Sequence, residues 1–337
     1  MAFIEFKNLH TWFYTDAGIV KAVNGVDFEI RKGETVCVVG ESGCGKSALC
    51  KSIMKLLPKT AKIKSGKILA DGIDITDYTQ RNMSRLRGDL FSMIFQDPMT
   101  SLNPTMTIGK QIEEAVRIHN KKMPKKQVKK KVLELMQLVE IDEPEVRISQ
   151  YPHEFSGGMR QRAVMAIALA GNPKILFADE PTTALDVTIQ AQILDVFRRI
   201  QKKLGMATVF ISHDLGVVAG VADRVAVMYA GKIVEIGTAE EIFYDPRHPY
   251  TWGLLQSLPI LSRGKEWLPT LPGMPPTLIH PPKGDAFAER NAYAMRIDYE
   301  KEPPMFQVTD THYAATWLLD ERAPKVKAPI GERKYGK

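Results

Sequence analysis

The sequence predicts an α/β protein with a mostly parallel central sheet, and three observations lead to this prediction. Short runs rich in apolar residues recur along the chain, at Glu34–Val39, Ile175–Ala178 and Ala207–Ile211. Such runs are typical of strands buried on both faces of a parallel sheet. Segments with apolar residues at helical spacing lie between them. Residues Phe3 to Ile30 alternate apolar and polar positions around a turn near Asp16–Gly18, which predicts antiparallel strands before the parallel core.

A glycine-rich stretch follows the first apolar run and matches the pattern G-x-x-x-x-G-K-[ST]. The stretch precedes a segment with helical periodicity, Ala48 to Leu57. A strand, a glycine turn and a helix N-terminus together direct backbone N–H groups at one point, which suits a phosphate. Lys46 adds a positive charge for the β- and γ-phosphates, and the Ser47 hydroxyl can bind Mg²⁺. We therefore predict nucleotide binding by Gly40, Glu41, Ser42, Gly43, Cys44, Gly45, Lys46, Ser47 and Ala48.

The composition narrows the class of protein further. The 337 residues give room for one large domain or two moderate ones. Since no run of about 18 apolar residues occurs, we expect no membrane-spanning helix. The N-terminus lacks a basic region followed by an apolar stretch, so we expect no secretory signal. A disulfide among Cys37, Cys44 and Cys50 would compete with the loop geometry, which favours free thiols in a reducing cytosol.

The formal net charge is +7, and much of the excess lies in one run, Lys121–Lys131. A basic surface can face nucleic acid or an anionic membrane, or it can be a solvated exterior. The run leads into a segment with Val128, Val132, Met136 and Val139 at helical spacing. This pattern favours the solvated face of an amphipathic helix.

Polar side chains follow three of the predicted strands. Gln96 comes just after the apolar run Phe91–Phe95, Asp179 and Glu180 follow Ile175–Ala178, and His213 follows Ala207–Ile211. Open α/β sheets place their ligands at the carboxyl ends of the strands. Asp179 would hold Mg²⁺, directly or through water, and Gln96 could reach a metal-bound phosphate or water. Glu180 would orient or deprotonate the water that attacks the γ-phosphorus, and His213 can reach the γ-phosphate or that water.

A second helix start suited to an anion lies more than a hundred residues after the first. Ser156 can cap the helix that contains Ala163–Ala170, and Gly157 and Gly158 leave its N-terminus accessible. Two arrangements explain a second phosphate-binding helix end. One subunit can fold both around a single nucleotide, or two subunits can each contribute one.

The remaining segments are less specific. Ser65–Asp74 predicts a hairpin that turns at Asp71 and Gly72. Residues from about 100 to 165 are helical in pattern, with prolines as breaks. Phe13, in the cluster Trp12-Phe13-Tyr14, can stack on adenine, although core packing explains the cluster better from the residues alone.

Taken together, these motifs resemble the nucleotide-binding subunit of an ABC transporter over roughly residues 5 to 280. The stretch Phe155–Arg162 resembles the signature motif of that family. The resemblance implies a P-loop, RecA-like core, with Walker A at Gly40–Ser47, Walker B at Ile175–Glu180 and Gln96 as the Q-loop. It further implies that Ala184–Asp186 is the D-loop, that His213 is the switch histidine and that Phe13 is the adenine-stacking aromatic.

The resemblance extends to the ATPase subunits of bacterial oligopeptide and dipeptide importers. It rests on Phe95–Pro104, Tyr151–Gly158, Ala178–Val187, His213–Val218 and His248–Thr251. It implies an ATP-hydrolysing motor for peptide uptake, with nickel, glutathione or another small solute as alternative cargo. A soluble ABC ATPase acting on nucleic acid or ribosomes and a regulatory ATP-binding module are competing interpretations. One cassette without sustained heptads disfavours the first, and the retained hydrolytic residues disfavour the second.

The implied assembly has a second, non-identical ABC ATPase subunit bound head to tail, so that Ser156 of one subunit faces the γ-phosphate held by the other's Lys46. Two membrane-spanning permease subunits complete it, with an extracellular solute-binding protein as an indirect partner and no nucleic acid. The expected location is the cytoplasmic face of the plasma membrane, as a peripheral subunit. The expected domains are a nucleotide-binding domain at 1–250, with a helical subdomain at about 98–165, and a loop-rich extension at 251–337.

One departure concerns this extension, in which many members carry four cysteines that hold an iron–sulfur cluster. The corresponding positions here are Asp285, Asn291, Asp298 and Thr316. None can supply a thiolate, so we expect no iron–sulfur cluster. The cofactors that the resemblance implies are ATP and Mg²⁺. The last 92 residues, counted from Pro246, hold 13 of the 21 prolines, which predicts a loop-rich segment wrapped on the main domain, with a mobile end at 325–337.

Overall fold

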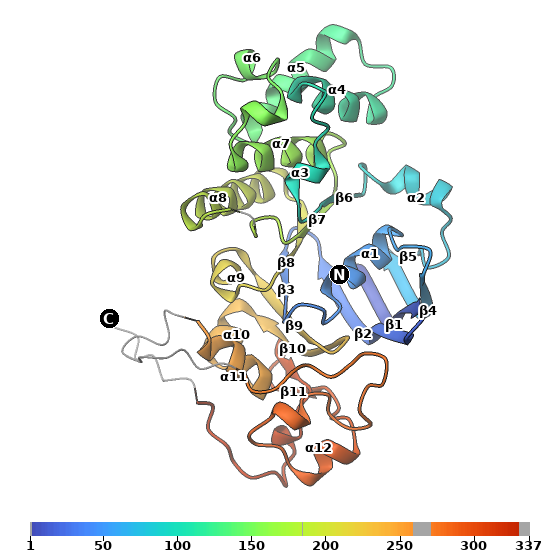
Figure 1. Cartoon of the computed structure of the whole chain (residues 1–337), viewed down its shortest axis with the longest axis vertical. Helices are drawn as coiled ribbons and strands as arrows, with labels where there is room; N and C mark the ends of the chain where they lie inside the picture. The colour runs from blue at the N-terminus through green and yellow to red at the C-terminus, as the bar shows by residue number, and fades with distance from the viewer. Residues whose placement is uncertain (1, 184, 259–270, 330–337) are drawn as a thin grey trace. The chain divides into compact units, whose positions relative to one another are not determined.

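The structure is a computed structural model that describes residues 2–183, 185–258 and 271–329. The chain forms two compact parts (Figure 1). The helical part contains residues 30–35 and 77–211, and the β-rich part contains residues 2–29, 36–76 and the described residues from 212 on. Ala184 of the expected D-loop and residues 330–337 of the expected mobile end lie outside the described residues.

The β-rich part begins with an antiparallel sheet of strand order β2-β1-β4-β5. β1 and β4 pair along most of their length, and the predicted turn near Asp16 joins β1 to β2. Asp71 and Gly72 both have positive φ, 48° and 81°, and they form the predicted hairpin turn. The hairpin begins at Ala61, whereas the sequence predicted a start at Ser65. The strands are β1 (Ala2–Thr15), β2 (Gly18–Arg31), β4 (Ala61–Ala70) and β5 (Ile73–Asp74).

A second set of strands in the β-rich part has the order β11-β12-β10-β9-β3. β3 runs parallel to β9, and the residues of both are buried because the strands lie inside the core. β10 is antiparallel to β9, β12 pairs with β10, and β11 pairs with β12. The strands are β3 (Thr35–Val39), β9 (Arg224–Tyr229), β10 (Lys232–Thr238), β11 (Phe306–Gln307) and β12 (Tyr313–Ala314).

The helices of the β-rich part are short. We define the C-terminal region as the described residues from α10 to η4; it is loop-rich, as predicted, and contributes β11 and β12 to the sheet that contains β3 (Figure 1). The helices are α1 (Lys46–Met54), α9 (Leu215–Val221), α10 (Ala239–Tyr244), α11 (Pro249–Gln256), η3 (Ala288–Arg290), α12 (Arg296–Glu300) and η4 (Trp317–Leu319).

The helical part contains three parallel strands in the order β8-β7-β6. Their carboxyl ends lie at one edge, since Asp179 at the end of β7 pairs with Ile211 on β8. The predicted apolar runs therefore form parallel strands, as expected from their lack of alternation. The strands are β6 (Phe91–Ile94), β7 (Ile175–Asp179) and β8 (Ala207–Ser212).

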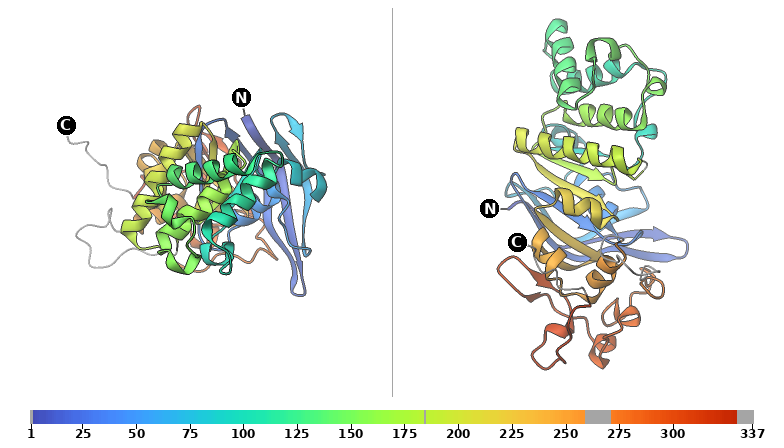
Figure 2. Two further views of the ribbon diagram at one scale, coloured as in Figure 1. Left: turned by 90° about the horizontal axis from the view of Figure 1, so that it is seen from above. Right: turned by 90° about the vertical axis from the view of Figure 1, so that its left-hand side faces the viewer.

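Prolines begin several helices of the helical part, because the fixed φ of proline suits the first helical turn. Pro98, Pro144 and Pro152 start α3, α6 and η1, and Pro124 precedes α5. Helices α4, α5 and α7 pack together (Figure 2, green). The helices are α2 (Gln80–Leu86), α3 (Pro98–Ser101), α4 (Ile108–His119), α5 (Lys125–Leu138), α6 (Pro144–Arg147), η1 (Pro152–Glu154), α7 (Gly157–Leu169) and α8 (Val187–Leu204).

Helix α5 has the amphipathic character that its sequence predicts. Val128, Val132 and Met136 are buried, and most lysines of the run Lys121–Lys131 are exposed. The basic run is thus a solvated helix face. Among the described helices, none combines the length and apolar character needed to cross a bilayer. The predicted α/β class, with an antiparallel N-terminal sheet, a mostly parallel core and a helical segment, is confirmed.

Candidate nucleotide-binding site

The glycine-rich loop after β3 curls around the ammonium group of Lys46. The Nζ atom of this buried side chain donates to the carbonyl oxygens of Gly40, at 2.7 Å, and Glu41, at 2.9 Å. Gly40 and Gly45 have φ values of 150° and 110°, which favour glycine. A Cβ atom on Gly45 would lie 2.0 Å from the carbonyl oxygen of Ala22. The loop therefore requires glycine at this close approach, and it holds a positive charge at the start of α1.

This loop fits the phosphates of a nucleotide. The backbone N–H groups at the start of α1 and the Lys46 ammonium group both favour an anion there. Ser47, the second residue of α1, is half-buried, and its hydroxyl has the hard oxygen that Mg²⁺ prefers. Cys37, Cys44 and Cys50 are buried, and among the described residues none of these thiols forms a disulfide. Burial raises the pKa of the Cys44 thiol, although Lys46 opposes this effect, so the thiol stays protonated within the loop.

A polar cluster lies at the carboxyl ends of β6 and β7 in the helical part. Gln96 Nε2 donates to Glu180 Oε2 at 3.1 Å, and Thr183 Oγ1 donates to the same oxygen at 3.0 Å. Asp179 is the last residue of β7 and is 5% exposed. The structure thus brings together Gln96 and Glu180, two of the polar residues that the sequence places after strands. Carboxylate and amide oxygens are ligands that a hard cation prefers, and Asp179 and Gln96 supply these two types of oxygen at the strand ends.

The backbone of Glu180 lies in the left-handed region, with φ of 48°. This conformation is uncommon for a residue with a side chain and costs free energy, on the order of 1–3 kcal/mol. The Glu180 N–H donates to the carbonyl oxygen of Ile211 on β8 at 3.1 Å, which helps to hold the conformation. Strained residues of this kind cluster at functional sites, and Glu180 is a carboxylate at the sheet edge.

The start of α7 has the geometry that the sequence predicts. Ser156 is exposed, and its Oγ accepts a hydrogen bond from the Met159 N–H at 3.3 Å, which caps the helix. A Cβ atom on Gly158 would lie 2.6 Å from Ile189 Cγ2 on α8, so glycine permits the close packing of the two helices. Asp186 caps α8 by accepting from the Ile189 N–H at 3.0 Å.

A cavity of about 440 Å³ lies beside the start of α7 and includes Ser156 in its lining. Two arginines of its lining contact Glu140. Arg162 donates to the Glu140 carbonyl oxygen at 2.5 Å, and Arg199 forms an ion pair with the Glu140 carboxylate at 2.8 Å. Glu140, Arg162 and Arg199, which line the same cavity as Ser156, are therefore held by contacts with one another.

Two predicted residues remain, Phe13 and His213, and both belong to the β-rich part. Phe13 lies on β1 opposite Ala61 and is half-buried, so it is outside the fully buried core that the sequence favoured for it. His213 follows β8 directly and is exposed. Asp214 caps α9 by accepting from the Gly216 N–H at 2.7 Å, which fixes the backbone next to His213.

Three contacting residues were not predicted. Thr183 contacts Glu180, and a hydroxyl three residues after a carboxylate was the available signal. Tyr250 and Arg290 contact Glu41 of the loop. These two residues lie 209 and 249 positions from Glu41, and no local pattern indicates such contacts.

The four polar positions of the C-terminal region are buried and hydrogen-bonded within their own turns. The side-chain oxygens of these residues accept from the backbone N–H groups of Phe287 (2.9 Å), Tyr293 (2.9 Å), Met295 (2.6 Å) and Leu318 (3.3 Å). Asp and Asn side chains stabilise turns in this way. The four residues are Asp285, Asn291, Asp298 and Thr316.

Comparison with known proteins agrees with this geometry. A family model described as ABC transporter matches residues 23–183. A second, described as oligopeptide/dipeptide transporter, C-terminal region, matches residues 234–297. The chain is 60% identical to the oligopeptide transport ATP-binding protein OppD of Bacillus subtilis (strain 168), over 97% of this chain and 91% of that protein. It is 58% identical to the dipeptide transport ATP-binding protein DppD of Lactococcus lactis subsp. cremoris (strain MG1363), over 96% and 93%.

A solved structure supports the same assignment. The ATP-binding cassette MJ0796, in a dimeric post-hydrolysis state bound to ADP and Pi, is 27% identical with a TM-score of 0.62. The match covers 70% of this chain and 98% of that one. The chain belongs to the ABC transporter family of transport ATPases, and within it to the ATP-binding proteins of oligopeptide and dipeptide transport. The resemblance drawn from the sequence motifs is therefore confirmed.

Proposed function

We propose that this chain is the ATP-hydrolysing motor subunit of an importer that takes up dipeptides or oligopeptides. The proposal rests on the match of nearly the whole chain to an oligopeptide transport ATP-binding protein, including the C-terminal region. The loop around Lys46 and the carboxylates after β7 supply the chemistry that such a motor requires. Family membership favours transport over a role on nucleic acid or ribosomes.

Each site residue has a proposed role. Lys46 and the loop amides bind the β- and γ-phosphates, and Phe13 stacks on the adenine. Ser47, Asp179 and Gln96 would hold Mg²⁺, which neutralises negative charge on the phosphates when it is bound. Glu180 accepts the proton of the attacking water, with Gln96 and Thr183 fixing its carboxylate. The loop residues Glu41–Gly45 and Ala48 line the phosphate site, and His213 contacts the γ-phosphate.

We infer that ATP is held between two subunits. Ser156 is exposed at a capped helix start, with Gly157 exposed next to it, so a phosphate on a neighbouring molecule can reach this helix end. In this arrangement Ser156, Gly157 and Gly158 face the nucleotide that a second, non-identical ABC subunit binds. ATP then joins the subunits, and loss of the γ-phosphate lets them separate.

The partners follow from this role. Two permease subunits that span the membrane would carry the solute, and an extracellular solute-binding protein would deliver it. The chain would act at the cytoplasmic face of the plasma membrane as a peripheral subunit. We further propose that its C-terminal region folds without an iron–sulfur cluster, because the four buried positions are oxygen- or amide-bearing residues engaged in local turns. Iron and sulfide analysis of the purified chain tests this.

Uptake in cells that lack the chain tests the cargo. The wild-type chain should restore uptake of labelled dipeptides or oligopeptides, whereas Glu180→Gln should not. Glu114→Gln, which changes an exposed carboxylate on α4, is the matched control and should restore uptake fully. Normal peptide uptake without the chain would contradict the proposal. Loss of nickel or glutathione uptake instead would assign one of those alternatives.

A further inference from the structure

Glu41, the second residue of the phosphate-binding loop, is contacted through all of its polar groups. Its carbonyl oxygen accepts from Lys46 Nζ at 2.9 Å, within the loop. Its N–H donates to the Tyr250 hydroxyl oxygen at 2.8 Å. Its two carboxylate oxygens accept from Arg290, at 2.6 Å and 2.9 Å. Two of these three contacts come from the C-terminal region, so the loop is held from outside the nucleotide-binding core.

Arg290 is suited to this contact because nearly all of its side chain is buried and each of its three nitrogen atoms donates a hydrogen bond. The side chain is 4% exposed. Nε donates to the Pro272 carbonyl oxygen at 2.8 Å, and Nη1 also donates to the Tyr229 hydroxyl at 3.2 Å. The hydrogen bonds to Glu41 raise the pKa of Arg290, so the guanidinium stays charged. A two-point contact between arginine and carboxylate fixes direction as well as distance.

Tyr250 is held equally firmly. It is fully buried, and its ring centroid lies 4.5 Å from that of Tyr229 and 5.4 Å from that of Phe287. Burial raises the pKa of the Tyr250 hydroxyl, so it stays protonated and accepts from Glu41 through a lone pair. The aromatic cluster thus gives the hydroxyl one position against the loop.

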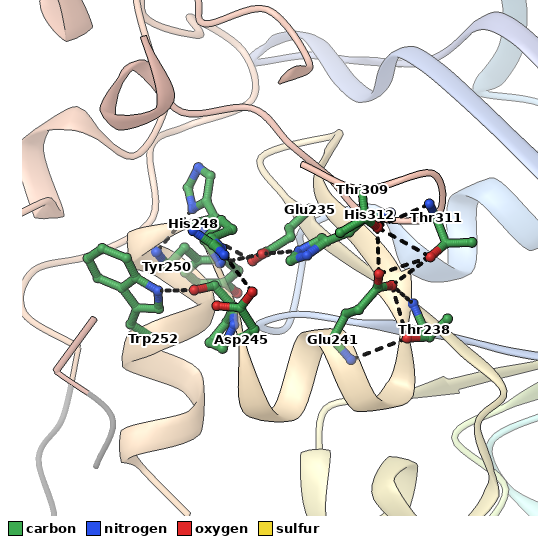
Figure 3. Close-up of polar contacts among 12 residues, drawn as sticks. Glu235, Thr238, Glu241, Asp245, His248, Tyr250, Trp252, Thr309, Thr311 and His312 are labelled. Atoms are coloured by element: carbon green, nitrogen blue, oxygen red, sulfur yellow. Dashed lines mark hydrogen bonds and ion pairs between the residues drawn. The ribbon is translucent and has the colours of Figure 1, made fainter. Parts of the chain in front are cut away.

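A buried polar network anchors the start of α11, where Tyr250 lies (Figure 3). The Glu235 carboxylate on β10 accepts from the His248 N–H at 3.1 Å and contacts His312 Nε2 at 2.8 Å. His248 Nδ1 in turn accepts from the Tyr250 N–H at 3.0 Å. Glu235, His248 and His312 are all fully buried, and burial lowers the pKa of His248 to about 3, so this histidine is neutral. The network connects the segment around β12 to the residue that contacts the loop.

A second group of contacts reinforces the same connection. The Glu241 carboxylate on α10 accepts from Thr309 Oγ1 at 2.6 Å and from Thr311 Oγ1 at 2.9 Å (Figure 3). The segment that carries His312 is therefore tied to α10 as well as to β10. Movement of this segment would be transmitted to Tyr250 through His312, Glu235 and His248.

We propose that Arg290 and Tyr250 are positioning residues for nucleotide binding: through Glu41 they hold the phosphate-binding loop in its binding geometry. This inference rests on the proposed role of the loop in binding ATP. Arg290 also neutralises a carboxylate that would otherwise repel the phosphates. The C-terminal region is in this way part of the nucleotide site, and a partner that displaces Arg290 or Tyr250 would lower the affinity for nucleotide.

The test compares Arg290→Met with Arg322→Met. Arg322 resembles Arg290 because it also contacts a carboxylate, that of Asp320, at two points. It differs because it is exposed and does not contact the loop. Arg290→Met should raise the Kd of the chain for a fluorescent ADP analogue, and the KM of the assembled transporter for MgATP, by about tenfold, with kcat changed less than about twofold. Arg322→Met should leave all three unchanged. Arg290→Lys, which keeps the charge but not the two-point contact, should lie between.

Two further variants test the same contact to Glu41 independently of Arg290→Met alone. Tyr250→Phe removes one oxygen from the contact and should raise the Kd for ADP by about threefold; it decides the inference if Arg290→Met does not fold. The double variant Glu41→Gln, Arg290→Met removes both charges and should bind ADP more tightly than Arg290→Met alone. An unchanged Kd in both Arg290→Met and Tyr250→Phe, or a double variant that binds ADP no more tightly than Arg290→Met, would overturn the inference. A wild-type transporter that binds ADP without hydrolysing ATP would contradict the proposed function, and the Kd comparison would still decide this inference.

Discussion

Replacement of Glu180 by glutamine tests the assignment of the general base. Gln96 Nε2 and Thr183 Oγ1 both donate to Oε2 of Glu180. The glutamine carbonyl oxygen can accept both hydrogen bonds, so the geometry at the end of β7 is retained. These bonds become neutral and weaker in an exposed setting, which should cost less than about 1 kcal/mol of stability. Loss of a general base lowers the rate by about 10²–10⁴-fold, or roughly 3–5.5 kcal/mol of activation free energy.

Phosphate release by the assembled transporter at saturating MgATP measures this effect. We expect Glu180→Gln to lower kcat by at least about 100-fold, while binding of a fluorescent ATP analogue stays close to that of the wild type. Glu114→Gln on α4 is the control and should leave both quantities unchanged. Hydrolysis within about tenfold of the wild-type rate would refute the base role, because no general base is lost at so small a cost.

Three further predictions concern the loop, the helix start and the C-terminal region. Lys46→Ala removes the charge that the loop surrounds, so the affinity for nucleotide in equilibrium dialysis should fall by at least about tenfold; an unchanged affinity would count against the loop. Ser156→Arg should block ATP-driven association with the partner ATPase and leave nucleotide binding by the isolated chain unchanged, whereas loss of that binding would contradict the two-subunit site. Burial raises the pKa of Asp285 to about 6 from 3.8, so its contribution to stability is present below pH 3.8 and is lost as the pH rises through 6. The free energy of unfolding should therefore decrease by up to about 3 kcal/mol between pH 4 and pH 7 because of this group, and Asp285→Asn should remove that slope in denaturant titrations; an unaltered slope would argue against burial as the cause.

The parts of the site that the sequence predicts are those fixed by local chemistry. The strand before Gly40, the helix from Lys46 and the cap at Ser156 each follow from a few neighbouring residues. The contact between Gln96 and Glu180 was predictable for a related reason. Glu180 directly follows β7 and Gln96 comes two residues after the end of β6, and neighbouring parallel strands end at the same edge of the sheet.

The parts that the sequence does not predict depend on pairing between distant segments. Arg290 and Tyr250 reach Glu41 because β9, α11 and η3 pack together, and no periodicity reports that packing. The pairing of β12 with β10 escaped prediction because β12 is only two residues long and lies in a proline-rich segment. The left-handed backbone of Glu180 was not predictable either, since it depends on the hydrogen bond to Ile211 on another strand.

The central claim is that ATP is bound between the loop of one subunit and the Ser156 helix start of another. The most direct measurement is an electron cryomicroscopy structure of the assembled transporter, carrying Glu180→Gln, with MgATP. We predict that Ser156 Oγ lies within hydrogen-bond distance, about 3 Å, of the γ-phosphate bound by the partner ATPase subunit. A Ser156 that faced no nucleotide, or that faced the nucleotide bound by Lys46 of its own chain, would contradict the two-subunit site.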